Sequence, residues 1–301
     1  MDGGFQIKPT VRKSFEVLIS LFKRRFKRVV PNSFYLKLWH YECHQLWPNI
    51  NHPATFSEKI LLRKLNPRPV FTMLSDKYRV RDYVEHNIGA SYLPKLYHVC
   101  EDLDYRSFSK LPRAFVMKSN RGSGLNLIVR DKSAHTFPEL FDLAYEWRNI
   151  NKGVDAKEAH YSEIKPLTIF EEFITDDNEG SVPKDYKFHC FRKDGVERIF
   201  IQVDSDRFEN HTRLMYDLEW NELDFEIEKP KSPFKLEKPP NLGKMIEVAR
   251  TLSAGFHYVR VDLYSVDNDI KFSELTFTPT GGLGVFRPVS IDAEWGGFFY
   301  K

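Results

Sequence analysis

Three pairs of short apolar segments, each pair joined by a tight polar turn, most constrain how this chain can fold. The pairs cover residues 114–130, 185–203 and 257–276, and their turns contain Asn-Arg-Gly-Ser-Gly, Asp-Gly and Asp-Asn-Asp. Short turns of this kind connect antiparallel neighbours, whereas parallel strands need a long crossover. Helical patterns precede and separate the pairs. This order predicts an α+β fold with layered helices and sheets, and not a parallel doubly wound sheet.

The expected helices are recognised by their ends and their apolar spacing. Residues 53–65 begin with a capping box, in which Thr55 is the N-cap and Glu58 follows three residues later. A second helix is expected over 70–86, ending before Gly89. Two further helices are expected over 137–149, with Phe141, Ala144 and Tyr145 facing inward, and over 242–252.

Composition excludes several classes of protein. No stretch approaches the roughly 18 consecutive apolar residues that a membrane-spanning helix needs. Cys43, Cys100 and Cys190 form no CxxC pair, which argues against a disulfide framework or a zinc site and favours a reducing, cytoplasmic location. The net charge of +3 argues against a nucleic-acid partner. Residues 220–241, rich in Pro, Lys and Glu, predict an exposed connection.

The N-terminal residues 11–30 have a different character from the rest of the chain. They read VRKSFEVLISLFKRRFKRVV, and helical spacing places an apolar stripe opposite a cluster of cations. Such a basic amphipathic helix can lie on an anionic membrane surface. A terminal helix that packs on the protein with a solvated basic face fits the pattern equally well.

A lysine and a glycine-rich turn form the first candidate site. Lys118 ends an apolar segment directly ahead of the turn Asn-Arg-Gly-Ser-Gly at 120–124. A charge at the end of a buried strand is costly unless it meets an opposite charge. Glycines let backbone N–H groups approach phosphate oxygens, so the pair fits an anion such as a phosphate. The spacing is not that of a P-loop, and a simple turn is the alternative.

Charged side chains on the last pair of strands form the second candidate site. Arg260 and Asp262 share one face of their strand, and Glu274 and Thr276 share one face of the next, because side chains alternate with period two. If the strands pair, two carboxylates and an arginine converge on one surface. Hard oxygen ligands of this kind suit magnesium that carries nucleotide phosphates. A solvated sheet face with an ion pair is the alternative.

Two weaker patterns complete the set. Glu171 and Glu172 interrupt an apolar strand expected over 167–173, so at least one must face a polar partner or solvent. Residues 202–213 read as a polar loop that either faces a substrate or serves no special role. The chain has no GxSxG, HExxH or CxxC motif and no HRD and DFG pair, so nothing supports a serine hydrolase, a zinc peptidase or a classical kinase.

Several long segments resemble the TupA-like ATP-grasp family of polysaccharide biosynthesis loci. They lie within residues 51–286 and read NHPATFSEKI, SDKYRVRDYV, LPRAFVMKSNRGSGLNLIV, IFEEFI, PKDYKFHCF, IQVDSDRFENHTR and RVDLYSVDNDIKFSELTFTPTGG. The resemblance implies an ATP-grasp fold, in which two α+β lobes clamp ATP and Mg²⁺ and a glycine-rich hairpin closes over the phosphates. It also implies an additional N-terminal helical segment over 1–50, a helical region over 51–112, a small lobe over 113–172 and a large lobe over 173–301.

The resemblance also implies roles for single residues. The expected ATP-binding residues are Lys77, Lys118, Arg121, Gly122, Ser123, Gly124, Glu171, Glu172, Phe173, Ile174 and Asp185. The expected metal ligands are Asp262, Glu274 and Thr276, and the expected catalytic residues are Arg260, Arg213 and Lys187. Many superfamily members have Asn where this chain has Thr276, and a hydroxyl can still ligate magnesium.

The activity that this resemblance implies is amide bond formation. A carboxylate attacks the γ-phosphorus of ATP to give an acyl phosphate and ADP, and an amine then displaces phosphate. The expected substrates are a uronic acid carboxylate of a bacterial cell-surface polysaccharide and an amino acid or other amine, with the basic helix placing the enzyme at the inner face of the membrane. A kinase that phosphorylates a sugar hydroxyl and a non-catalytic nucleotide-binding protein are the alternatives.

Overall fold

The computed structural model describes residues 30–175, 183–205 and 211–300. Backbone contacts divide the chain into two units, Met1–Pro48 and Asn49–Lys301. The first unit contains helix α2 (Asn32–His44) in its described part. The basic helix predicted over 11–30 lies outside the described residues except for its last residue. Within the described residues, no helix combines the length and the apolar run that crossing a membrane requires.

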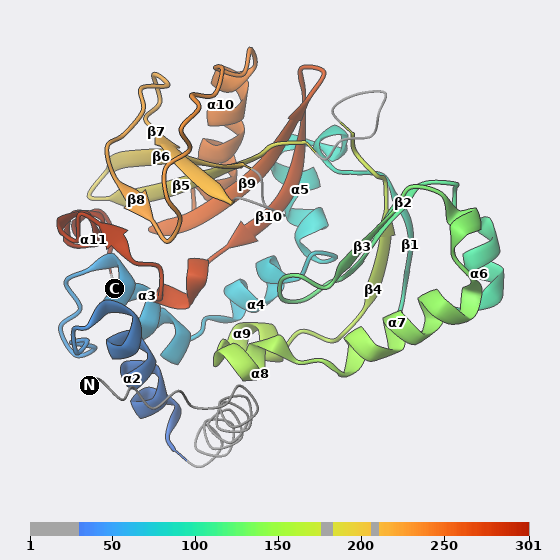
Figure 1. The fold of residues 1–301 in the computed structure, drawn as a ribbon, viewed down its shortest axis with the longest axis horizontal. Helices are drawn as coiled ribbons and strands as arrows, with labels where there is room; N and C mark the ends of the chain where they lie inside the picture. The colour runs from blue at the N-terminus through green and yellow to red at the C-terminus, as the bar shows by residue number, and fades with distance from the viewer. Residues whose placement is uncertain (1–29, 176–182, 206–210, 301) are drawn as a thin grey trace, which may run out of the picture. The chain divides into compact units, whose positions relative to one another are not determined.

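Two antiparallel sheets organise the second unit (Figure 1). The four-stranded sheet has the order β1-β4-β2-β3, and the five-stranded sheet has the order β10-β9-β5-β6-β7. A small third sheet pairs β11 with β8. The antiparallel pairings confirm the predicted α+β class. The strands are β1 (Leu96–Cys100), β2 (Phe115–Ser119), β3 (Asn126–Val129), β4 (Thr168–Glu171), β5 (Asp185–Lys193), β6 (Val196–Ser205), β7 (Thr212–Tyr216), β8 (Glu226–Ile227), β9 (Tyr258–Val266), β10 (Asp269–Thr276) and β11 (Phe286–Arg287).

Helices cover these sheets, and the predicted capping box is present at the first of them. Thr55 Oγ1 accepts a hydrogen bond from the backbone N–H of Glu58, and Glu58 Oε2 accepts one from the N–H of Thr55. Both bonds satisfy donors that the helix itself cannot pair. The helices of this unit are α3 (Phe56–Leu65), α4 (Pro69–Ser75), α5 (Val80–Ile88), α6 (Tyr105–Lys110), α7 (Phe137–Asn149), α8 (Lys152–Ala156), α9 (Ala159–Ser162), α10 (Leu242–Ser253) and α11 (Ser290–Gly297), with short 3₁₀ turns at Ala90–Tyr92, Lys132–Ala134 and Pro279–Gly282.

The single helix predicted over 70–86 is wrong, because the chain breaks between α4 and α5. Asp76 Oδ1 accepts hydrogen bonds from the backbone N–H groups of Tyr78 (2.9 Å) and Arg79 (3.3 Å), in the turn that separates α4 from α5. The N–H of Lys77 leaves the helix pattern and donates to Asn120 O at 2.9 Å. The break therefore places Lys77 beside the turn that follows β2.

Helix α7 covers one face of the four-stranded sheet. Leu140, Ala144 and Trp147 are buried at spacings of four and three residues, and they pack against apolar residues of β2, β3 and β4. Tyr145 was expected to face inward and is 52% exposed, because it lies one residue beyond this stripe. The burial of Ala144 is confirmed, whereas that of Tyr145 is wrong.

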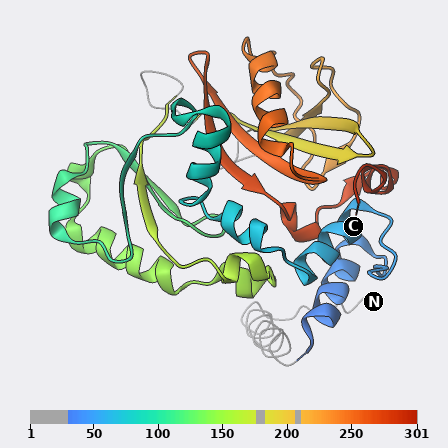
Figure 2. The same cartoon turned by 180° about the vertical axis from the view of Figure 1, so that it is seen from behind.

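The two faces of the five-stranded sheet differ. One face packs on α10 and α5 through an apolar core that includes Phe188, Val261 and Leu252 (Figure 2). The opposite face changes along each strand. Toward one end it carries aromatic side chains, such as Phe191, which pack with α3 and α11. Toward the other end it carries charged and polar side chains, so the candidate site lies on this part of the sheet.

The region 220–241 is not simply an exposed connection, which corrects the prediction. Trp220 stacks on Tyr216 with ring centroids 4.1 Å apart, and its indole N–H donates to Leu236 O. Phe225 and Ile227 are buried in the core that also contains Trp295. Its strand β8 pairs with β11 and helps to close the polar end of the sheet.

Candidate active site

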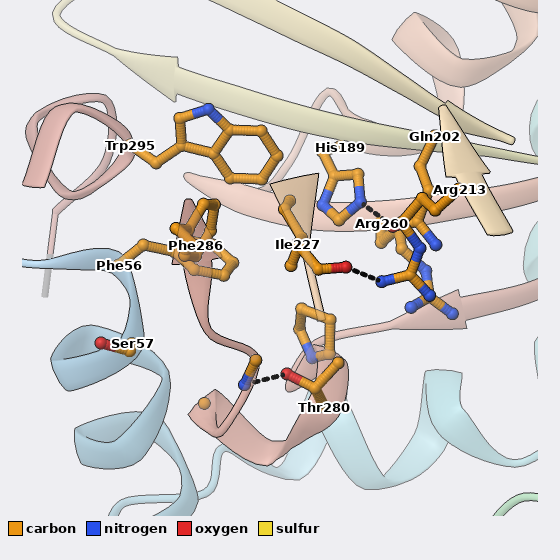
Figure 3. A pocket seen from close by; sticks show the side chains of 13 residues that line it. Phe56, Ser57, His189, Gln202, Arg213, Ile227, Arg260, Thr280, Phe286 and Trp295 are labelled. Atoms are coloured by element: carbon orange, nitrogen blue, oxygen red, sulfur yellow. Dashed lines mark hydrogen bonds between the residues drawn. The ribbon is translucent and has the colours of Figure 1, made fainter. Parts of the chain in front are cut away.

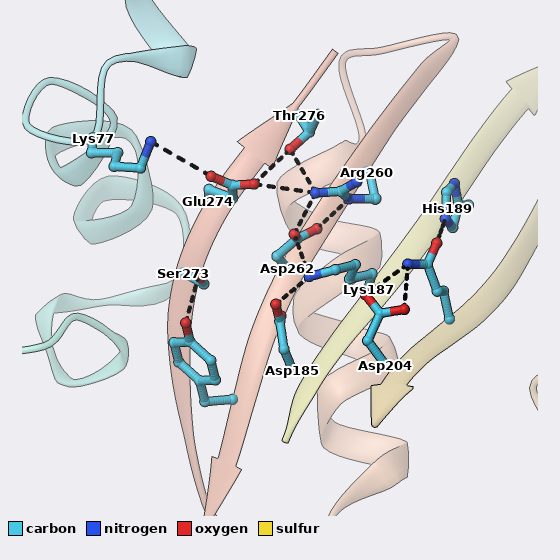
Figure 4. A network of polar contacts seen from close by, with 12 residues as sticks. Lys77, Asp185, Lys187, His189, Asp204, Arg260, Asp262, Ser273, Glu274 and Thr276 are labelled. Atoms are coloured by element: carbon cyan, nitrogen blue, oxygen red, sulfur yellow. Dashed lines mark hydrogen bonds and ion pairs between the residues drawn. The ribbon is translucent and has the colours of Figure 1, made fainter. Parts of the chain in front are cut away.

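The hairpin of β9 and β10 brings the predicted acids together. In the strand register, Glu274 lies opposite Asp262 and Thr276 lies opposite Arg260. The predicted pairing across the Asp267 turn is therefore confirmed. All four side chains lie on the polar face of the sheet and contact one another (Figure 4).

Arg260 is the centre of this cluster. Its Nε and Nη2 donate to the two carboxylate oxygens of Asp262 at 2.7 and 2.6 Å, a bidentate arrangement. Nη2 also contacts Glu274 Oε1 and Thr276 Oγ1, both at 3.1 Å. The fixed fork of the guanidinium therefore holds both acids and the hydroxyl in one set of contacts.

Lys77 reaches one of these acids, Glu274, from outside the sheet. Its Nζ lies 3.6 Å from Glu274 Oε2 and donates to Gly122 O at 2.6 Å. Burial alone would raise the pKa of Glu274, but the charges of Lys77 and then Arg260 outweigh it and hold that pKa at about 2. Burial lowers the pKa of Lys77, and Glu274 opposes the shift. The glycine-rich turn, the helix break and the β10 acid therefore meet at this amino group.

Lys187 and Asp185 extend the cluster along β5. Lys187 Nζ contacts Asp185 and lies 3.2 Å from Asp262 Oδ2. All three side chains are nearly fully buried. Asp185, one of the expected ATP-binding residues, therefore lies in a series of ion pairs with the expected metal ligand Asp262.

The predicted ATP-binding residues 171–174 lie at the end of β4 and directly after it. Lys118 Nζ forms an ion pair with Glu171, and Arg81 lies 3.9 Å from the same carboxylate. The Glu172 carboxylate accepts a hydrogen bond from the N–H of Lys95 at 3.1 Å. Both glutamates that interrupt the apolar strand thus find polar partners, as expected. Phe173 lies under the guanidinium of Arg130, and Ile174 follows as a half-buried residue.

Arg121 lies in the predicted phosphate loop, but its side chain faces away from it. The guanidinium donates to three backbone carbonyls, those of Ile164, Arg148 and Ile150, at 3.2, 3.0 and 3.3 Å. These contacts anchor the base of the hairpin. A nucleotide-binding role for Arg121 stays a prediction, and it would involve the backbone. Ser123 and Gly124 are exposed at the tip.

The polar loop predicted over 202–213 is wrong at both ends. Gln202 and Asp204 lie on β6 and Arg213 lies on β7, with Asp204 opposite Arg213. Arg213 Nε donates to Asp204 Oδ1 at 2.6 Å, and Gln202 Nε2 donates to the same carboxylate at 3.1 Å. Gln202 Oε1 lies 3.0 Å from His189 Nε2. A buried hydrogen-bond chain therefore crosses β7, β6 and β5.

This series of hydrogen bonds lies beside a small cavity, which Arg213, Gln202 and His189 line. The cavity has a volume of about 30 Å³, and Arg213 and Arg260 both line it together with Trp295 and Phe286 (Figure 3). Burial, followed by the charge of Arg260, lowers the pKa of His189 to about 3, so this ring is neutral at physiological pH. Among the described residues that line the cavity, the cationic side chains are therefore Arg213 and Arg260.

The acid pair fits magnesium only as part of a larger ligand set. Within the described residues, no group of three or more His, Cys, Asp or Glu side chains could hold a metal ion. Mg²⁺ in nucleotide sites characteristically takes one or two carboxylates and completes its shell with phosphate oxygens and water. Asp262 and Glu274, on adjacent strands with Glu274 ionised, provide such a pair.

A comparison with family models identifies the family of this chain. The model of the TupA-like ATP-grasp family matches residues 58–300. The chain belongs to this family. The predicted ATP-grasp fold of this TupA-like protein is therefore confirmed, and the two antiparallel sheets and the glycine-rich hairpin are its observed form.

Solved structures with similar folds include three bacterial enzymes. D-Alanine–D-alanine ligase from Helicobacter pylori shares 13% identity at a TM-score of 0.43, over 76% of this chain and 62% of that one. The Bacillus anthracis D-alanine–D-alanine ligase complexed with ATP shares 15% identity at a TM-score of 0.40, over 68% of this chain and 54% of that one. N5-carboxyaminoimidazole ribonucleotide synthetase from Thermus thermophilus shares 13% identity at a TM-score of 0.40, over 70% of this chain and 47% of that one. The TupA-like chain thus spans less than two thirds of each structure. No curated protein matches it.

One residue that shapes the site was missed from the sequence. Asn120 is fully buried, and its amide nitrogen donates to Asp76 Oδ1 and to Lys165 O, both at 3.0 Å. Its amide oxygen accepts from the N–H of Leu167 at 2.8 Å. The sequence pattern indicates only a turn residue at Asn120. The signal that could have found it is its position between a buried strand and the glycines, where a buried amide must satisfy several partners.

Proposed function

We propose that this TupA-like ATP-grasp protein is an ATP- and magnesium-dependent carboxylate–amine ligase. It would join an amino acid or other amine to the carboxylate of a uronic acid in a bacterial cell-surface polysaccharide. The carboxylate oxygen bonds to the γ-phosphorus as ADP leaves, and the amine nitrogen then bonds to the acyl carbon as phosphate leaves. Family membership supports the general class of ATP-dependent ligase, and the substrates follow from the resemblance.

The observation that carries the proposal is the convergence of cations from three segments on the β9–β10 acids. Lys77 comes from the helix break, Arg260 from β9 and Lys187 from β5. A phosphoryl group in transfer spreads negative charge over its oxygens, and fixed cations that face this charge stabilise the transition state. These cations lie beside the two acids without a nucleotide, so they are positioned to face a phosphoryl group that the acids bring to the site through a metal.

The other site residues have distinct proposed tasks. ATP with magnesium, when bound, would supply the phosphoryl group that activates the carboxylate. Asp262 and Glu274 would hold the metal, and the hairpin at Gly122 would supply backbone N–H groups to the phosphates. Arg213, held by Asp204 beside the cavity, would orient the anionic substrate. A guanidinium suits this task because its planar fork matches a carboxylate.

A product analysis tests the proposal. The protein is incubated with ATP, Mg²⁺, glucuronate or galacturonate and a pool of amino acids, and the mixture is analysed by mass spectrometry and by assays for ADP and phosphate. A ligase gives a new amide with ADP and phosphate in equal amounts. A phosphorylated sugar formed with ADP, without release of phosphate, would instead establish the kinase and contradict the ligase. The Asp262→Asn variant is the control for contaminating ATPases.

A further inference from the structure

A second and larger cavity lies on the TupA-like protein, lined by residues that the proposed function does not use. Its volume is about 300 Å³, within the range of small-molecule pockets. It is formed between the end of α3, the start of α4 and the start of β9. Its lining residues are Leu62, Arg63, Asn66, Arg68, Phe71, Phe256, His257 and Tyr258.

Two arginines of this cavity have no acidic partner. Within the described residues, neither Arg63 nor Arg68 forms an ion pair with a carboxylate. The positive charge of Arg68 instead acts on Arg63. Burial, reinforced by this neighbouring charge, lowers the pKa of Arg63 to about 10. Both guanidinium groups lie near the Phe71 ring, at 5.1 and 5.8 Å from its centroid, and the charge of Arg68 acts on Arg63. An anion bound beside them offsets this repulsion.

Arg63 uses only one nitrogen of its guanidinium group, Nη1, in hydrogen bonds to the described residues. Its Nη1 donates to Tyr258 O at 3.0 Å and to Phe277 O at 3.1 Å. Among the described residues, Nε and Nη2 have no hydrogen-bond partner. The guanidinium also lies 5.1 Å from the ring centroid of Phe71 and 5.6 Å from that of Tyr258, which fixes its plane. Arg63 thus presents oriented donors in a preformed position.

The remaining lining supplies an apolar wall next to these charges. Phe71 is buried, and Phe256 is half-buried beside it. The Arg68 guanidinium lies 5.8 Å from the Phe71 ring centroid at the exposed rim. Aromatic walls with a few convergent polar groups are typical of sites for small organic ligands.

From these features we propose that the cavity binds a small organic anion, in which a carboxylate or phosphate ester is attached to a flat apolar body. Arg63 and Arg68 hold the anionic group, and Phe71 and Phe256 pack against the body. The basic segment 11–30 of this same chain is a poor occupant, because its cations carry the same sign as both arginines.

The cavity also lies close to the candidate active site along the chain, because Arg63 contacts residues that are sequence neighbours of site residues. Arg63 donates to the carbonyls of Tyr258 and Phe277. Tyr258 lies on β9 two residues before Arg260, and Phe277 directly follows Thr276, the last residue of β10. A ligand on Arg63 would therefore lie next to the strand ends that carry the expected catalytic residue Arg260 and the expected metal ligand Thr276. Binding itself is independent of the ligase reaction, so its test needs neither ATP nor a uronic acid.

The test measures binding of benzoate and phenyl phosphate to the full chain by calorimetry, with benzyl alcohol as the neutral analogue. The substitution Arg68→Gln removes an exposed guanidinium that makes no hydrogen bond among the described residues. The matched control is Arg106→Gln, an exposed arginine on α6. At least one anion is expected to bind, about tenfold more weakly to Arg68→Gln, since a hydrogen bond to a charged group contributes about that factor. Affinity for Arg106→Gln stays unchanged.

Comparison of the two anions shows whether the site prefers a carboxylate or a phosphate ester. An independent measurement follows the ¹⁵N signal of Arg63 Nε, assigned by its loss in Arg63→Lys, which is expected to shift on titration. Absence of saturable binding below about 10 mM, equal affinity for benzyl alcohol, or equal affinity of the two glutamine variants would overturn the proposal. The last result would place the anion elsewhere, for example among the cations near Glu274.

Discussion

The amino group of Lys77 lies 3.6 Å from Glu274 Oε2, although the two residues are far apart in the chain. This contact joins the break between α4 and α5 to strand β10. It also fixes the charge state of the acid, because Lys77 is the largest favourable influence on the ionised form of Glu274. The position of the helix break is thereby linked to the protonation of a candidate metal ligand.

The acid pair is expected to be essential for nucleotide chemistry and dispensable for folding. In the double variant Asp262→Asn, Glu274→Gln, ADP formation is expected to fall at least about 1000-fold, because the metal and its charge stabilisation are lost. Magnesium-dependent binding of a non-hydrolysable ATP analogue, which requires no knowledge of the acceptors, is expected to weaken in parallel. Circular dichroism checks the fold. The control is Glu237→Gln, Glu247→Gln, two exposed sites. Normal turnover in the acid variant would refute the metal assignment.

Glu274 is expected to make stability depend on pH in a defined window. Its pKa in the folded protein is about 2, below its ordinary value of 4.5. A lowered pKa means that the ionised group stabilises the fold above pH 4.5, and that this contribution is lost as the pH falls toward 2. Urea titrations between about pH 6 and about pH 2.5 measure the free energy of unfolding of the wild type and of Glu274→Gln. The wild-type value minus the variant value is expected to decrease as the pH falls.

The same subtraction in a Lys77→Met background provides the control for this pH dependence. Without the lysine charge, the pKa of Glu274 is expected to move upward, so the window becomes narrower. Identical curves in both backgrounds would show that Lys77 does not act on Glu274.

Asn120 is expected to contribute strongly to stability. Asn120→Ala removes one of the three hydrogen bonds to Asp76 Oδ1 and takes the side-chain partner from the N–H of Leu167 and the carbonyl of Lys165, at a cost of about 3 kcal/mol in the free energy of unfolding. Asn87→Ala is the matched control, because Asn87 is exposed and donates only to Tyr83 O within its own helix. Urea denaturation measures both. A loss below about 0.5 kcal/mol for Asn120→Ala would contradict the role assigned to this amide.

Two adjacent glycines of α11 are expected to respond oppositely to the same substitution. A Cβ at Gly296 would lie 2.0 Å from Ala54 O, so Gly296→Ala must displace backbone and is expected to cost about 3 kcal/mol. A Cβ at Gly297 would meet nothing within 4 Å, and Gly297→Ala is expected to be neutral or slightly stabilising. Melting temperatures compare the pair. Equal melting temperatures would show that α11 does not approach the start of α3 this closely.

The N-terminal segment is expected to contribute to location and not to catalysis. Deletion of residues 1–30 is expected to move the protein out of membrane fractions while its ADP formation in solution is retained. Fractionation of cell lysates, with the full chain alongside, measures the shift. Unchanged fractionation would dismiss the surface-helix hypothesis.

The parts of the fold that could be predicted from sequence are those with local signals. The capping box at Thr55 and the Asp194-Gly195 turn were found because each is specified by a few adjacent residues. The face shared by Arg260 and Asp262 followed from the period of a strand. These signals do not depend on the rest of the chain.

The parts that were missed depend on contacts between distant segments. The sequence near Ser75 contains no signal that predicts the helix break. The break is stabilised by a hydrogen bond from Asn120, which lies 44 residues from Asp76 in the chain. Strand β1 went unrecognised because its five residues are all half-buried and show no alternation. The inward turn of Arg121 could not be foreseen either, since its acceptors are carbonyls of α7 and of the chain that leads to β4.

The hydrogen bonds of Asn120 divide the glycine-rich hairpin into a stationary base and a tip. Asn120 ties the base to the helix break and to the start of β4, and Lys77 extends the fixed part to the carbonyl of Gly122. Beyond that point, Gly124 has a positive φ of 69° that suits glycine. Ser123 and Gly124 lie beyond this anchored part, so the spacing between Lys77 and the β10 acid is set by contacts in which the tip of the hairpin takes no part.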